Sequence, residues 1–227
     1  MKYFCYAVVC FLCVSLSSFS QEKYSVRPKQ KSQDNDSVFI TSGKYYSTYG
    51  DYVIGKYNEI TDLVVSAREN SLIGGGDLKI EVKNKDLKKV LKKARIIEYQ
   101  NMLLVNCKGL KNGAFRLGTG YAPAFCYSYK KIIFASMPVG SREAFITTSF
   151  GLVGASIVYD KLVCYSISSD SKNVNRIYEE DVEQMLFKRP DLLERYRNEN
   201  RRDRTSARTV IKYLREAGLI KPSEEMQ

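Results

Sequence analysis

The sequence predicts an α+β fold: a meandering, mostly antiparallel sheet with one internal amphipathic helix and a C-terminal helical subdomain. Residues 78–82 alternate between apolar and charged side chains, which is the period of a half-exposed strand. Apolar residues from 87 to 94 recur at helical spacing. The same is true of residues 179–218, where Pro190 and Gly218 mark helix boundaries. Strands followed by a run of helices are typical of α+β proteins.

The first twenty residues have the layout of a secretory signal peptide. Lys2 provides a positive start, residues 4–16 form a short apolar run, and small residues lead up to Ser20. We therefore expect cleavage between Ser20 and Gln21. The apolar run is shorter than the roughly 20 residues that cross a bilayer. The sequence predicts a secreted or periplasmic protein without a transmembrane span in its mature chain.

The mature chain has the length of one ordinary globular domain. Residues 21–36 are polar and read as a flexible tether. We expect a β-rich mixed domain over residues 37–178, with helices from 179 to 218 packed on it. Residues 219–227 are expected to form a tail.

Two helices in the β-rich domain are predicted from their N-terminal caps. Thr48 and Asp51 have the spacing of a capping box, which predicts a short helix over Tyr49–Ile54. Asn84 is a favourable cap for a helix over Lys85–Arg95, whose apolar stripe should lie on the sheet.

Strands are expected where short apolar runs are bounded by turn residues. The uncharged stretch 144–159 reads as buried core, as a helix or a strand, with the helix preferred. The expected strands are 60–66, 78–82, 96–99, 103–107, 125–127, 132–137, 162–167 and 174–177.

Histidine is absent from the chain, which excludes catalytic triads and zinc sites built on imidazole. No metal and no cofactor is expected. After signal removal Cys107, Cys126 and Cys164 remain, and they can be three small buried residues or one disulfide with a third thiol.

Five tyrosines lie between residues 45 and 57, and they allow two interpretations. Tyr45, Tyr46, Tyr49 and Tyr52 could form an aromatic surface for sugars or peptides, since tyrosine has an apolar ring and a polar tip. The same residues suit a half-buried helix that packs on the sheet, and we prefer this interpretation.

The basic charge is concentrated in two segments. The chain has 36 basic and 25 acidic residues, and residues 79–95 alone carry eight basic and two acidic groups. The second segment is the C-terminal one, where Arg204, Arg208, Lys212 and Arg215 form a stripe at helical spacing. Segregated charge indicates an anionic partner, although it also occurs on solvated surfaces.

The first segment predicts a basic face for binding. With the apolar stripe of the helix on the sheet, its basic residues should point outward, away from the core. An anionic envelope polymer, lipid headgroups or an acidic protein partner would suit such a face, whereas export makes nucleic acid unfavourable. The predicted ligand-binding residues are Lys85, Lys88, Lys89, Lys92, Lys93 and Arg95.

Several short stretches resemble one family. They are Gly-Lys-Tyr-Tyr at 43–46, Leu-Leu-Val-Asn-Cys at 103–107, Gly-Tyr-Ala-Pro-Ala-Phe at 120–125, Phe-Gly-Leu-Val-Gly-Ala at 150–155 and Arg-Pro-Asp-Leu-Leu-Glu-Arg-Tyr at 189–196. With these motifs the chain is similar, after residue 37, to a family of exported Bacteroides-type proteins of unknown function. The resemblance implies export and a whole-chain domain, and it implies no catalytic residues.

The favoured function is therefore that of an exported, non-enzymatic binding or envelope-associated protein. The alternative is a glycan hydrolase that works without histidine through a pair of carboxylates. Its candidate acids are Asp51, Glu143 and Asp160, which lie near glycines and aromatic residues in the sequence.

Overall fold

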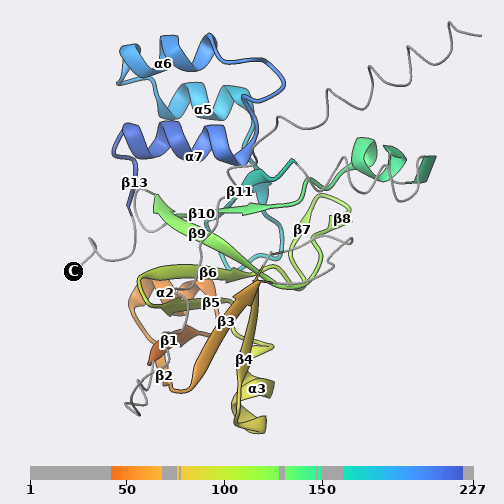
Figure 1. Ribbon diagram of the computed structural model, residues 1–227, viewed down its shortest axis with the longest axis vertical. Helices are drawn as coiled ribbons and strands as arrows, with labels where there is room; N and C mark the ends of the chain where they lie inside the picture. The colour runs from red at the N-terminus through yellow and green to blue at the C-terminus, as the bar shows by residue number, and fades with distance from the viewer. Residues whose placement is uncertain are drawn as a thin grey trace, which may run out of the picture. The chain divides into compact units, whose positions relative to one another are not determined.

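The computed structural model describes residues 42–67, 76, 78–127, 131–146, 148–149 and 161–221, all of which belong to one compact unit (Figure 1). The α+β class is confirmed, because an antiparallel sheet is combined with several helices. The strands are β1 (Gly43–Tyr46), β2 (Asn58–Ile60), β3 (Leu63–Ala67), β4 (Leu78–Val82), β5 (Ile96–Tyr99), β6 (Met102–Asn106), β7 (Lys111–Asn112), β8 (Phe115–Arg116), β9 (Tyr121–Tyr127), β10 (Lys131–Ser136), β11 (Val163–Ile167), β12 (Asn175–Arg176) and β13 (Ile220–Lys221). The helices are α2 (Tyr49–Ile54), α3 (Lys85–Leu91), α5 (Glu179–Met185), α6 (Pro190–Arg197) and α7 (Ala207–Glu216).

The main sheet is built around β9. The strands of this sheet follow the order β12-β11-β10-β9-β6-β5-β1-β2, so most strands that are adjacent in the sheet are also consecutive in the chain. The β3–β4 hairpin joins β9 where Leu78 pairs with Tyr121, and β13 joins the same strand where Ile220 pairs with Tyr127. The short hairpin β7–β8 forms a separate two-stranded sheet.

Both faces of the sheet are covered, which explains why its central strands are apolar at nearly every position. In β10, Ile132 and Phe134 face a core that contains α2, whereas Ile133 faces a core that contains α5, α6 and α7. In β5, Ile96 joins the first of these cores and Ile97 joins a third, which contains α3 and the β3–β4 hairpin. The C-terminal helices and α3 therefore cover different parts of one sheet face (Figure 1).

The caps predicted from the sequence are present. The Thr48 hydroxyl accepts a hydrogen bond from the Asp51 N–H at 2.9 Å, and the Asp51 carboxylate accepts one from the Thr48 N–H at 3.2 Å. Pro190 is the first residue of α6. Gly218 follows α7 with a φ of 68°, a left-handed conformation that glycine adopts without steric cost.

Several predicted boundaries were wrong. The strand expected over 125–127 already begins at Tyr121, where β9 pairs with β6. The helix expected over Lys85–Arg95 ends at Leu91 and continues only as a turn. The strand expected over 60–66 is divided into β2 and β3, because Asp62 adopts a left-handed φ of 57°. Residues 219–227 were expected to be a tail, but β13 pairs with β9 and Ile220 is buried because the central strand offers it a place in the core. The stretch 144–159 was expected to be buried core with a helix preferred; its described residues, 144–146 and 148–149, are helical, but all except Ile146 are exposed, so the expectation of burial is wrong for them. The rest of the stretch lies outside the described residues.

Candidate functional site

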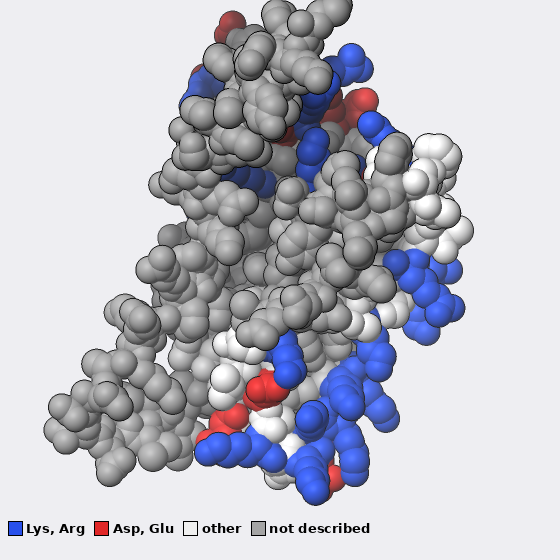
Figure 2. Space-filling view, turned by 45° about the vertical axis from the view of Figure 1, so that its right-hand side comes forward, with Lys and Arg blue, Asp and Glu red and all other residues white. Residues whose placement is uncertain are grey.

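The predicted basic face lies on α3 and the turn that follows it. The Asn84 side chain caps α3 by accepting hydrogen bonds from the N–H groups of Asp86 (2.8 Å) and Leu87 (3.4 Å). Leu91 is buried in the core beneath the helix, so the opposite side of α3 is turned to solvent. Five lysines are exposed there, and we call them the α3 basic face: Lys85, Lys88, Lys89, Lys92 and Lys93. Figure 2 shows this concentration of blue side chains at the lower right.

Few carboxylates neutralise the α3 basic face. Lys89 forms an exposed ion pair with Asp86 at 3.2 Å, and the other four lysines form none with the described residues. On β4, Glu81 is held by Lys79 at 2.5 Å. The hydrogen bond and charge of Lys79 lower the pKa of Glu81, and the charge of Lys88 adds a smaller contribution. The α3 basic face therefore keeps most of its charge for an external partner.

Arg95 was predicted in the basic face, and this prediction was wrong. Because α3 ends at Leu91, the Arg95 side chain is partly buried at the start of β5. Its Nη1 donates hydrogen bonds to the main-chain oxygens of Asn106 (2.5 Å) and Lys108 (3.3 Å). Burial lowers the pKa of Arg95. Arg95 holds the chain in place beneath the surface and does not present its charge on it.

The buried side chain of Asn106 brings Lys108 next to the α3 basic face. Its amide nitrogen donates to the main-chain oxygens of Ala94 (3.0 Å) and Lys92 (3.5 Å), and its amide oxygen accepts from the Lys108 N–H (3.0 Å). Lys108 is exposed. Sequence reasoning missed this residue, because its position depends on how β5 pairs with β6 and on the contacts of one buried amide.

The aromatic surface predicted as one of two alternatives is not formed. Tyr46, Tyr49 and Tyr52 are buried in the core with α2, and Tyr45 is partly buried. The Tyr46 ring meets the Tyr52 ring edge to face at 5.2 Å, and the Tyr46 hydroxyl donates to Glu98 at 3.0 Å. Burial, with Glu98 nearby, raises the pKa of Tyr46. The packing interpretation is correct, since α2 lies against the sheet.

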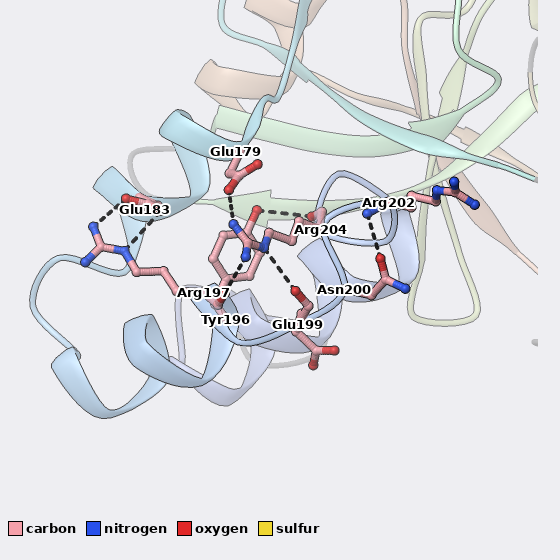
Figure 3. A network of polar contacts seen from close by, with 8 residues as sticks. All are labelled: Glu179, Glu183, Tyr196, Arg197, Glu199, Asn200, Arg202 and Arg204. Carbon is pink, nitrogen blue, oxygen red and sulfur yellow. Dashed lines mark hydrogen bonds and ion pairs between the residues drawn. The ribbon is translucent and has the colours of Figure 1, made fainter.

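Most side chains of the C-terminal basic stripe (Arg204, Arg208, Lys212 and Arg215) make contacts within the protein. Arg204 forms an ion pair with Glu179 and donates to the main-chain oxygens of Arg197, at the end of α6, and of Glu199, in the loop that follows (Figure 3). Lys212 pairs with Glu199 at 3.1 Å, and the guanidinium of Arg215 lies 5.8 Å from the Phe125 ring centre. Arg208 is exposed. Most of this stripe stabilises the helices and is not arranged for an external partner.

An open cleft of about 510 Å³ lies between the β7–β8 hairpin and the start of the helical segment at 141–146. Within it Arg176 pairs with Glu143 at 2.9 Å, and both side chains are mostly buried. The lining residues are Asn112, Gly113, Ala114, Phe115, Val139, Gly140, Ser141, Arg142, Glu143, Arg176 and Tyr178. Within the described part of the chain, Glu143 is the single carboxylate of the lining, whereas Asp51 serves the cap of α2. Asp160 lies outside the described residues.

The remaining predictions concern the cysteines, the signal cleavage site and membrane spans. Among the described residues, Cys107, Cys126 and Cys164 form no disulfide, and Cys107 and Cys164 are buried. Ser20, Gln21 and the tether lie outside the described residues. Within the described part of the chain, no helix has the length and apolar character required to cross a membrane.

Comparison with known proteins identifies the family of the chain. No curated protein and no solved structure matches the chain. A family of unknown function, DUF6563, matches residues 44–221, a range that contains nearly all the described residues. The matched range includes α3, Asn106 and the C-terminal helices, so the chain belongs to the DUF6563 family of unknown function.

Proposed function

We propose that this protein is an exported, non-enzymatic binding protein that contacts an anionic partner at the cell envelope through the α3 basic face. The observation that carries the proposal is the exposure of five lysines on one short segment, of which Lys89 alone has a carboxylate partner among the described residues. Export and a Bacteroides-type origin, which the signal peptide and the sequence resemblance suggest, belong to the same proposal.

The energetics of α3 support a role beyond solubility. Lys85 and Lys89 are four positions apart in the sequence, as are Lys88 and Lys92. Such like-charge pairs destabilise a helix by about 0.2–0.5 kcal/mol each. Lys88 and Lys89 lie in the last turn of α3 and Lys92 follows it, and for these three lysines the helix dipole offsets part of the cost. An anionic partner would relieve the remaining repulsion on binding.

The hydrolase alternative receives no support from a specific observation. Retaining and inverting glycosidases use two carboxylates on either side of the scissile bond. Among the described residues, one carboxylate lines the cleft, that of Glu143, and it already forms an ion pair with Arg176. We therefore favour the binding function over the hydrolase.

A charge-reversal experiment tests the proposal. The mature protein is titrated against dextran sulfate, poly-glutamate and vesicles of phosphatidylglycerol with phosphatidylcholine, at several salt concentrations. We expect binding to at least one probe that weakens steeply with salt, because exposed charges are screened over about 8 Å at physiological ionic strength. The α3 variant, Lys88→Glu, Lys89→Glu, Lys92→Glu and Lys93→Glu, should lose this binding.

The matched control changes the same net charge elsewhere. Its four substitutions, all at exposed positions outside α3, are Lys56→Glu, Lys131→Glu, Lys161→Glu and Lys188→Glu. The control should keep most of the binding, and circular dichroism should show that both variants are folded. Equal losses in the two variants would mean that only net charge matters, and the proposed site would then be wrong.

A further inference from the structure

We infer that the α3 basic face is one end of a longer basic track, which continues over the β6–β7 turn to the β7–β8 hairpin and binds a linear polyanion. The inference rests on the proposed function and specifies its partner. The added residues come from two separate segments of the chain, the stretch 108–116 and the loop before β12: Lys108, Lys111, Arg116 and Lys172.

The first step of the track joins α3 to Lys108. Asn106 holds the main chain of Lys92 and of Lys108 through one side chain, and Arg95 binds the Lys108 carbonyl from below. These contacts come from side chains that are buried or partly buried, so the two lysine-bearing segments are held together by the fold. The exposed lysines of the turn after α3 and Lys108 are thus carried by neighbouring segments of main chain.

The second step joins Lys108 to the β7–β8 hairpin. Lys111 begins β7, three residues after Lys108, and pairs with Arg116 across the hairpin, so both side chains lie on the same face. The Lys111 N–H donates to the Lys172 carbonyl at 2.9 Å, and the Val174 N–H donates to the Lys111 carbonyl at 2.9 Å. The two basic residues of the hairpin are thereby brought together with Lys172, which is distant in the sequence.

The added residues keep their charge available. Among the described residues, none of Lys108, Lys111, Arg116 and Lys172 takes part in an ion pair. The nearby carboxylate of Asp170 accepts a hydrogen bond from the Gly50 N–H at 2.9 Å. Arg116, Lys108 and Lys172 are exposed and Lys111 is partly so. Figure 2 shows further blue side chains above the group formed by α3, along the same edge of the molecule.

The surroundings of the track favour a polymer over a bilayer. Helices that lie in a membrane interface bury an apolar face in the lipid. In α3 that face is already packed on the protein core, as Leu87 and Leu91 show. The exposed large apolar residues of the described chain lie on other elements: Ile54, Tyr57, Val64, Phe145, Tyr178 and Phe187. A succession of cations along several elements suits a chain of regularly spaced anions, which releases counterions when it binds.

Salt dependence of binding to long-chain inorganic polyphosphate tests the track. The α3 set carries Lys88→Gln, Lys89→Gln, Lys92→Gln and Lys93→Gln. The hairpin set carries Lys108→Gln, Lys111→Gln, Arg116→Gln and Lys172→Gln. The control set carries Lys56→Gln, Lys131→Gln, Lys161→Gln and Lys188→Gln. Binding weakens with salt, so the slope of log Kobs against log salt is negative. For the α3 set and the hairpin set, the magnitude of this slope should decrease by about 0.7 for each phosphate that the variant no longer neutralises. In the control set it should decrease much less.

The outcomes separate this inference from the proposed function. If the hairpin set binds polyphosphate with the wild-type slope while the α3 set does not, the track is wrong and the α3 basic face stands. If the phosphatidylglycerol vesicles bind through α3 and polyphosphate does not bind, the polymer is wrong and the proposed function stands. If the α3 set matches the control with every probe, the proposed function is wrong as well.

Discussion

The guanidinium of Arg204, in the loop before α7, forms an ion pair with the carboxylate of Glu179, the first residue of α5 (Figure 3). The same guanidinium donates to the main-chain oxygens of Arg197, at the end of α6, and of Glu199. The Tyr196 hydroxyl in turn donates to the Arg204 carbonyl at 3.1 Å. One side chain thus links the start of α5 to the end of α6 and to the loop that leads into α7.

Replacing Arg204 with lysine should destabilise the protein although the charge is kept. Lysine cannot reproduce the planar set of donors that reaches Glu179 and two carbonyl groups, so partly buried acceptors lose their partners. We expect a loss of about 2 kcal/mol in the free energy of unfolding, measured by urea denaturation. Arg197→Lys is the control, because the Arg197–Glu183 ion pair lies at the surface, where such pairs contribute little to stability. Equal losses would contradict the central role of Arg204.

The protein should lose stability at alkaline pH through Tyr165. Burial raises the pKa of Tyr165 to about 12, and its hydroxyl donates to the Met137 carbonyl and accepts from the Val139 N–H. The unfolded chain ionises this tyrosine near pH 10, so stability is complete below that pH and is lost as pH rises toward 12. Tyr165→Phe should lower stability at neutral pH but weaken its alkaline dependence. Denaturation at a series of pH values measures both, and an unchanged dependence would exclude Tyr165 as a contributor.

Asn106→Leu should both destabilise the fold and loosen the site. The substitution leaves the Ala94 carbonyl and the Lys108 N–H without their partner, which should cost about 2 kcal/mol or more. Amide chemical shifts should change from Lys92 to Lys108, and polyanion binding should weaken beyond the loss of stability. Asn58→Leu, at an exposed position of β2, is the control and should change neither property. Normal binding by a folded Asn106→Leu protein would mean that the amide does not position the lysines.

Tyr52→Ala and Tyr57→Ala should differ strongly. Tyr52 is buried in contact with Tyr46, and its truncation should cost about 3 kcal/mol or more by leaving a cavity in the core. Tyr57 is 43% exposed, and its truncation should cost about 1 kcal/mol or less. Thermal unfolding of the two variants measures the difference. Similar melting temperatures would indicate that α2 is not part of the core.

The local elements follow from patterns within a few residues. The capping box of Thr48 and Asp51, the alternation over 78–82 and the proline that opens α6 each predicted an element that is present. Side-chain period and capping depend on neighbours less than one helical turn away. The same reasoning placed five lysines at exposed positions of α3 and of the turn after it, because the apolar stripe of the helix covers the core.

The sequence by itself determined the α+β class, most of its elements and the excess of positive charge near α3. Tertiary structure decided whether each side chain was exposed. The turn after α3 directs Arg95 inward, and Asn106 brings Lys108 to the α3 basic face. The charge of Arg204 is neutralised by an ion pair with Glu179. These outcomes depend on strand register and on contacts between residues far apart in the chain, so no pattern within a single segment contains them.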